Sequence, residues 1–171
     1  MITRTLLAGL TLLIAVAEPA KADALSSGLA AYRRGDYVAA AAKLGPLAER
    51  GVPRAQTILG FLYQYGRGVP QNYVVAAQWY EYAAEQGDPA AQYQLGLMFD
   101  KGHGVPRSSV IAYKWLSLAA AHASRGERDY YTRVRDAVAS KLNNAQKAEG
   151  QAHSYDWVVK PAPDWVIKPA P

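Results

Sequence analysis

The sequence predicts an all-α fold, an α/α solenoid of stacked antiparallel helical hairpins. Residues 51–86 and 87–122 align without a gap and share 15 identities in 36 positions. A fixed repeat of this size is typical of architectures in which each unit packs on its neighbours and buries a continuous core. Within each unit, two stretches carry apolar residues at helical spacing, and glycine and proline separate them. Each unit is therefore predicted to contain two helices.

An incomplete earlier copy precedes the two full units. Residues 24–34 are predicted to form its first helix, and Gly35 and Asp36 form its turn. Asp36, Asn72 and Ser108 follow one another at intervals of 36 residues. All three side chains are common N-caps, so a second helix is predicted to begin after each of them.

The first helix of each full unit is predicted to begin at Pro53 and Pro89, because proline is favoured in a first helical turn. Asp88 is the expected N-cap before Pro89. Residues 66–70 and 102–106 both follow the pattern Gly-x-Gly-Val-Pro, in which the glycines supply positive φ and the proline ends the helix. The apolar face of this helix is Ala55, Leu59, Leu62 and Tyr63 in one unit and Ala91, Leu95, Met98 and Phe99 in the next.

The second helix of each full unit combines small residues with one tryptophan. Its apolar face is Ala76, Trp79, Tyr80, Ala83 and Ala84, followed in the next unit by Ala112, Trp115, Leu116, Ala119 and Ala120. Small residues allow helix axes to approach closely, and the tryptophan is predicted to fill the volume between neighbouring hairpins.

The period is lost near Gly126, which is predicted to end the second full unit. Residues 127–142 are expected to form an amphipathic helix, and Asn143 or Asn144 is expected to cap a further helix that runs to about His153. Both helices are predicted to close the stack, since open repeat proteins need terminal caps. The predicted apolar face of the first cap helix is Tyr130, Val134, Ala137, Val138 and Leu142.

Residues 1–22 have the layout of a secretory signal peptide. A positive start at Arg4 precedes an apolar stretch over residues 6–17, and the small-x-small sequence of residues 20–22 predicts cleavage between Ala22 and Asp23. The apolar stretch is shorter than the roughly 20 residues that a spanning helix needs, which argues against an uncleaved anchor. The chain is thus expected to be exported, to the periplasm or beyond, with a solenoid over residues 23–155 and no stable membrane span in the mature chain.

The last 16 residues, 156–171, are a tandem octapeptide tail. Residues 156–163 and 164–171 differ only where one copy has valine and the other isoleucine, and each carries one tryptophan, Trp157 or Trp165. The Lys-Pro-Ala-Pro end of each copy is expected to be extended. Two interpretations are open: a docking motif anchored by both tryptophans, or packing of Trp157 on the final helix with no role for the second copy.

The repeated pattern resembles the Sel1-like repeat, a relative of the tetratricopeptide repeat. Residues 55–87 fit Ala-x3-Leu-Gly-x-Leu-Tyr-x2-Gly-x-Gly-Val-Pro-x8-Trp-x3-Ala-Ala-x2-Gly throughout, and residues 91–120 fit it with Phe99 in place of the tyrosine. The opening segment looks more like an ordinary tetratricopeptide repeat. The resemblance implies an adaptor that scaffolds protein complexes, often in the bacterial envelope. A cysteine-rich subset of the family is linked to β-lactam binding, but this chain contains no cysteine.

No catalytic, metal-binding or cofactor-binding residue is predicted. The Gly-x-Gly-Val-Pro loops lack the lysine and hydroxyl residue of a phosphate loop, and His103, His122 and His153 have no partner at ligand spacing. Charges of both signs are interspersed around a net charge of +5, so nucleic-acid binding is not indicated. The prediction is a non-enzymatic adaptor or scaffold for a protein or peptide in the bacterial cell envelope. One alternative is an envelope hydrolase or β-lactam-recognising protein, and another is a regulatory partner of a membrane sensor.

A binding surface is predicted on the concave side, which the first helix of each hairpin lines in tetratricopeptide-like stacks. The candidate residues share one property, which is that they differ between the two copies while the apolar face repeats. The alternatives for these residues are neutral drift and, for Phe61 and Leu97, simple packing. The candidates are Thr57, Phe61, Gln64, Tyr65, Tyr93, Leu97, Asp100 and Lys101.

Overall fold

Helices account for most of the chain that the computed structural model describes, which is residues 17–160, with side chains from residue 23 onward. The described helices are α1 (Ala17–Arg33), α2 (Tyr37–Glu49), α3 (Pro53–Tyr65), α4 (Tyr73–Glu85), α5 (Pro89–Lys101), α6 (Ser109–His122), α7 (Arg125–Ala139) and α8 (Asn144–Tyr155). Residues 1–16 of the predicted signal peptide and residues 161–171 of the tail lie outside the described residues. Cleavage between Ala22 and Asp23, a position within α1, stays a prediction.

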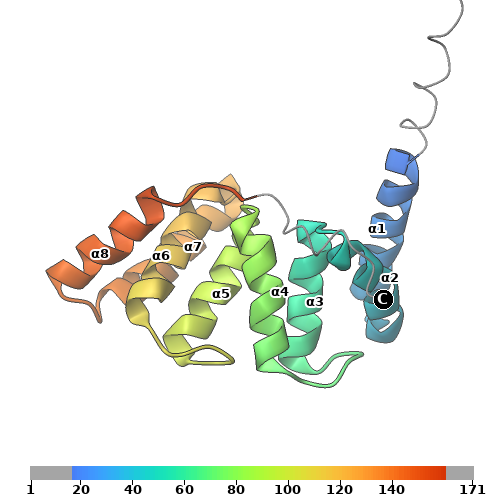
Figure 1. The fold of residues 1–171 in the computed structure, drawn as a ribbon, viewed down its shortest axis with the longest axis horizontal. Coiled ribbons are helices and arrows are strands. Elements are labelled where there is room, and N and C mark those ends of the chain that lie inside the picture. Colours follow the sequence, from blue (N-terminus) through green and yellow to red (C-terminus); the bar gives the residue numbers. More distant parts are fainter. Residues whose placement is uncertain (1–16, 161–171) are drawn as a thin grey trace, which may run out of the picture.

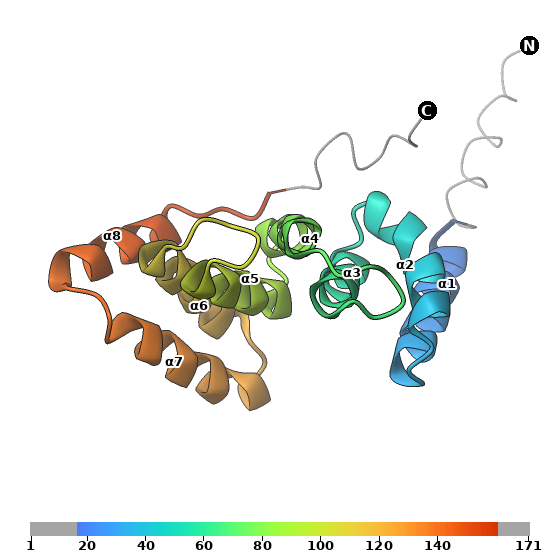
Figure 2. The same cartoon turned by 90° about the horizontal axis from the view of Figure 1, so that it is seen from below.

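The helices lie side by side in an arc, with α1 and α2 at one end and the cap helices at the other (Figure 1). Each helix from α1 to α6 packs against the next one along the chain. Helix α8 instead returns to α6, so that α7 and α8 lie on different sides of α6 (Figure 2). The predicted all-α solenoid of antiparallel hairpins is confirmed.

The predicted turn chemistry sets the helix starts. Asp36, Asn72 and Ser108 each accept a hydrogen bond from a backbone N–H in the first turn of the following helix. Asp88 does the same for α5, and Asn143 begins α8 with a reciprocal capping box. The first helix nevertheless starts at Ala17 rather than at residue 24.

The prediction for the first cap helix needs correction. Gly126 does not end the second unit, because Ser124 is the N-cap and α7 already includes Gly126 in its first turn. Tyr131 is 6% exposed, whereas Tyr130 is 50% exposed and Ala137 is also exposed. The buried face of α7 therefore passes through Tyr131 and Val138, one residue away from the predicted register at its N-terminal end.

The core consists of buried apolar clusters that follow one another along the stack. One buried cluster joins α1, α2 and α3, and a second joins α4, α5 and α6. Trp79 on α4 packs against the first cluster, and Trp115 on α6 is buried within the second. Phe61 packs against both clusters. The prediction that the tryptophans fill the volume between hairpins is confirmed.

Two glycines allow the helices of each hairpin to approach closely. A Cβ atom on Gly60 would lie 2.7 Å from the Tyr80 ring, and one on Gly96 would lie 2.7 Å from Leu116 Cγ. These distances are shorter than van der Waals contact, so a larger residue would push the paired helices apart. Glycine occurs at both positions because the side chain of the paired helix, Tyr80 or Leu116, occupies the space that a Cβ atom would need.

A buried hydrogen-bond relay joins three successive helices at the turns between units. Gln92, fully buried on α5, donates from Nε2 to Ala84 O at 3.0 Å, and its Oε1 lies 3.0 Å from Nδ1 of His122. Because Gln92 Oε1 can only accept, His122 Nδ1 carries the proton in this contact. Gln56 repeats the arrangement one unit earlier.

Replacing Gln92 by leucine should destabilise the fold by about 1 kcal/mol, because two hydrogen bonds are lost while Ala84 O keeps the Gly87 N–H as a donor. The measurement is the free energy of unfolding in urea. The control is His122→Gln, because Gln86 makes the equivalent hydrogen bond to Gln56 in the preceding unit. This variant should keep the hydrogen bond to Gln92 and change the free energy of unfolding by less than about 0.5 kcal/mol. A Gln92→Leu variant as stable as the wild type would contradict the structural role of the relay.

Candidate functional site

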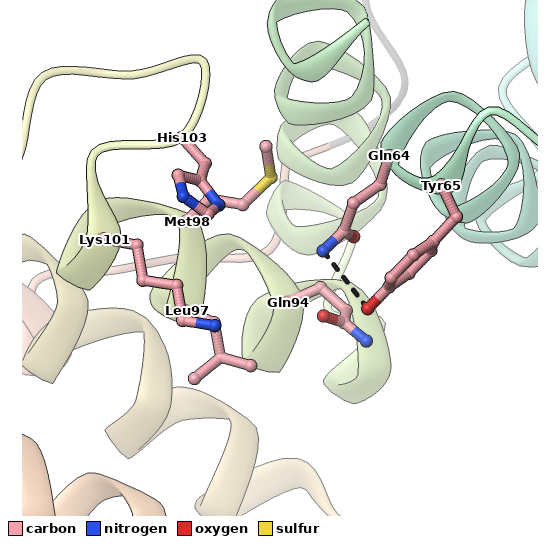
Figure 3. Close-up of a pocket in the computed structure, with 7 residues that line it drawn as sticks. All are labelled: Gln64, Tyr65, Gln94, Leu97, Met98, Lys101 and His103. Carbon is pink, nitrogen blue, oxygen red and sulfur yellow. Dashed lines mark hydrogen bonds between the residues drawn. The ribbon is translucent and has the colours of Figure 1, made fainter. Parts of the chain in front are cut away.

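A small pocket lies between α3 and α5, with a volume of about 50 Å3 (Figure 3). Four of the eight predicted binding residues line it, two from each helix. The lining residues are Gln64, Tyr65, Gln94, Leu97, Met98, Lys101 and His103. The sequence did not identify Gln94 or Met98 as part of a site, and it placed His103 only in an exposed loop.

Hydrogen bonds hold one wall of this pocket in place. The hydroxyl of Tyr80, a residue buried under α3, donates to Gln64 Oε1 at 2.7 Å. Gln64 Nε2 faces the hydroxyl of Tyr65 at 3.5 Å, and the side chain of Gln71 donates to Gln64 O at 2.9 Å. Burial raises the pKa of Tyr80, so its hydroxyl remains a donor throughout the physiological range. Gln64 thus connects the core to the pocket surface.

The rim of the pocket is basic and aromatic. Outside the pocket lining, the Arg67 guanidinium lies 5.8 Å from the centre of the Tyr65 ring and donates to the Tyr37 hydroxyl at 2.9 Å. Lys101 is exposed and forms no ion pair with any residue in the described range. The ring of His103 lies 4.9 Å from that of Tyr73, so this exposed loop residue is held against α4.

Two of the predicted binding residues belong to the packed interior of the first hairpins. Thr57 is only 7% exposed, and its hydroxyl donates to Pro53 O at 3.0 Å. Its hydrogen bond within α3 allows this polar side chain to be buried, so it is not part of an open surface. Phe61 is partly buried between the Tyr32 and Tyr65 rings, at 5.5 and 4.7 Å between ring centres.

Two further candidates on α5 are covered by the cap. Tyr93 stacks on Tyr131 with ring centres 4.6 Å apart, and its hydroxyl lies 2.9 Å from that of Tyr130. The Asp100 carboxylate forms an ion pair with Lys141 at 2.7 Å. Helix α7 and the residues after it therefore occupy much of the α5 surface that the sequence suggested was open.

The described part of the tail packs on the scaffold. Trp157 packs against the α4–α6 cluster, and its ring centre lies 5.1 Å from that of His122. It also borders a larger pocket of about 410 Å3, whose walls include Leu118 of α6, Arg135 of α7 and residues of α8. Trp165 lies outside the described residues.

Among residues 23–160, no group of three or more histidine, aspartate or glutamate side chains is arranged to hold a metal ion. No helix in the described range combines the length and apolar character required to cross a membrane. The fold and the site together define a helical-repeat scaffold.

Comparison with known proteins specifies the repeat. The sequence profile of the Sel1 repeat matches residues 53–88 and 89–124. These residues therefore match two consecutive Sel1 repeats. No curated protein matches the chain in a sequence search.

Two solved structures share the fold. A protective antigen present in uropathogenic Escherichia coli strains, displaying an SLR fold, is 29% identical with a TM-score of 0.74, over 85% of this chain and 31% of its own. A Sel1 repeat protein from Oxalobacter formigenes is 30% identical with a TM-score of 0.60, over 80% of this chain and 55% of its own. The chain thus spans about a third and about half of the lengths of these two proteins.

The contact between α5 and α7 should weaken at high pH. Burial, together with the nearby Glu127 carboxylate, raises the pKa of Tyr131 to about 12, and burial also raises the pKa of Tyr93. An unfolded tyrosine titrates near about 10. Because the folded-state pKa is the higher one, the stabilisation is complete below about pH 10 and is lost as the pH rises toward about 12.

Thermal unfolding followed across this pH range measures the effect. Tyr131→Phe should flatten the decline in stability, because the substituted ring cannot ionise. Tyr155→Phe is the matched control, since Tyr155 is 77% exposed, and it should leave the decline unchanged. Equal slopes for the wild type and Tyr131→Phe would show that Tyr131 does not cause the decline.

Proposed function

We propose that the chain is a non-enzymatic adaptor that binds a protein or peptide partner in the bacterial cell envelope through the pocket between α3 and α5. The proposal rests on one observation: the cap covers some of the predicted binding residues and leaves others exposed. Tyr93 and Asp100 already have partners in the cap, while Tyr65 and Lys101 remain exposed at the pocket. Sel1 repeat proteins typically scaffold protein interactions, which agrees with a binding role.

The pocket favours a particular chemistry in the partner. Lys101 places a positive charge at the pocket and forms no ion pair with a described residue. Leu97 and Met98 give its wall an apolar part, and the volume of about 50 Å3 suits one small side chain. A segment with a carboxylate next to a small apolar side chain would satisfy both features.

The cellular location in this proposal depends on the N-terminal sequence. Residues 1–22 have the layout of a signal peptide, with cleavage expected between Ala22 and Asp23. Both similar structures come from bacteria, which agrees with a bacterial envelope protein. The proposal assigns no catalytic residue and no cofactor.

Site-specific photo-cross-linking in the periplasmic fraction tests the proposed function. A photoreactive phenylalanine analogue at position 65 should give a discrete cross-linked protein. The same analogue at position 155, an exposed tyrosine at the far end of α8, should not give that product. Lys101→Glu should reduce the position-65 product by about tenfold or more, because it reverses a rim charge.

Two results would contradict the proposal. One is the same set of products from positions 65 and 155, which would indicate non-specific contact. The other is a position-65 product that Lys101→Glu leaves unchanged, which would remove the pocket rim from the binding surface.

A further inference from the structure

The cap helices leave a cavity between them. Helices α7 and α8 both pack on α6, but they lie on different sides of it and do not pack extensively against each other (Figure 2). The pocket of about 410 Å3 lies over α6, between these two helices. Each of the three helices contributes to its walls, through Leu118 and Ala121 of α6, Arg135 of α7, and Gln151 and Ser154 of α8.

The described segment after α8 closes one side of this pocket. The Lys160 N–H donates to Glu85 O at 2.9 Å, and Lys160 Nζ lies 2.6 Å from Glu85 Oε1. Three residues earlier, the Trp157 ring lies 5.1 Å from the His122 ring and 3.7 Å from the position that a Cβ atom on Gly87 would take. These contacts hold Trp157 in place as an aromatic wall of the pocket.

The pocket has the size and the aromatic lining of a small-molecule site. Tyr113 of α6 and Tyr155 of α8 add two rings to that of Trp157, and Leu118 gives an apolar floor that is 6% exposed. Pockets for small molecules usually measure roughly 300–1,000 Å3 and combine apolar walls with a few polar groups. Since a cavity of roughly 150 Å3 holds one benzene ring, this pocket can hold a ligand of about two rings.

Several polar side chains in the lining are not used by the fold. The hydroxyl of Ser117, the amide of Gln151 and the hydroxyl of Tyr113 form no hydrogen bond with any residue that the structure describes. The hydroxyl of Ser154, by contrast, already donates to Gly150 O at 3.0 Å. The free groups come from both α6 and α8, so a polar ligand between these helices would find donors on two sides.

The charge of the lining favours an anion. None of the described residues that line the pocket is acidic, and Arg135 supplies a fixed positive charge. Its Nε and Nη2 both donate to one oxygen of Asp136, at 2.9 and 2.7 Å, while Nη1 has no partner among the described residues. Because the Asp136 side chain is 60% exposed, this ion pair is weak, and a ligand carboxylate can bind the same guanidinium.

We propose that the pocket between α6, α7 and α8 binds a small aromatic carboxylate. Its ring packs against Trp157, and its carboxylate accepts hydrogen bonds from Arg135. Both features are needed for binding, because the ring supplies apolar contact and the carboxylate supplies a charge-assisted hydrogen bond. This site is separate from the α3–α5 pocket, so the inference goes beyond the proposed function and does not depend on it.

An NMR titration of the full-length protein tests the proposal. The probe is naphthoate, which joins a two-ring apolar group to one carboxylate, and the matched neutral compound is naphthalenemethanol. Amide signals of Ser117, Ala121 and Gln151 report on the proposed site. Signals of Leu97 and Lys101 report on the α3–α5 pocket in the same spectra.

Naphthoate should shift the signals of the proposed site in a saturable way and leave those of the α3–α5 pocket unchanged. Naphthalenemethanol should bind about tenfold more weakly, because it lacks the charge. Arg135→Gln should weaken naphthoate binding by about tenfold and leave the binding of the alcohol unchanged. The matched control is Arg133→Gln, which removes an exposed arginine of α7 outside the lining and should change neither affinity.

A blocking variant tests the location independently of charge. Ala121 is exposed and lines the pocket, so Ala121→Phe should place a ring in the cavity without disturbing the core, and it should abolish naphthoate binding. Naphthoate affinity equal to that of the wild type in this variant would overturn the proposal. So would the absence of saturable shifts at the proposed site, equal affinities for naphthoate and the alcohol, or equal losses from Arg135→Gln and Arg133→Gln.

Discussion

The buried glutamine relay is the constraint on which the architecture depends. Gln56 and Gln92 have no exposed surface, and each donates at 3.0 Å to a carbonyl in the last turn of the preceding helix, Ala48 O or Ala84 O. A buried amide without hydrogen-bond partners destabilises the fold. The two hydrogen bonds of Gln92 therefore require the ends of α4, α5 and α6 to meet in one geometry. The glycine turns between units lie at these helix ends. Trp157 packs beside one of them, at Gly87 and His122.

The two units share the same helices and turns, but side chains at equivalent positions differ. These differences determine which surfaces of the units are exposed. At equivalent positions of α3 and α5, Gln64 binds the Tyr80 hydroxyl while Asp100 binds Lys141 of the cap. Tyr65 remains half exposed, whereas α7 covers Tyr93. Helix α7 thus covers part of the α5 surface. The surface that remains available to a partner is at the α3–α5 pocket. Residues 157–160 pack on a separate surface.

The sequence predicted the repeated elements well, because their determinants are local. N-caps such as Asn72 and the first-turn proline at Pro53 act within a few residues, and both begin helices as predicted. The binding surface was less predictable because it depends on tertiary packing. Nothing near Tyr93 in the sequence indicates that α7 covers it, and the adjacent tyrosines of α7 made its register ambiguous. The burial of Thr57 depends on one hydrogen bond to its own helix.

The cap helices cover one surface of α5 and leave the α3–α5 pocket open. Hydroxyl-radical footprinting of the tyrosines, read by mass spectrometry of the intact folded protein, measures this directly. We expect rapid oxidation of Tyr65, which is 50% exposed, and protection of Tyr93 and Tyr131, whose rings stack on each other. Oxidation of Tyr93 as fast as that of Tyr65 would contradict this arrangement.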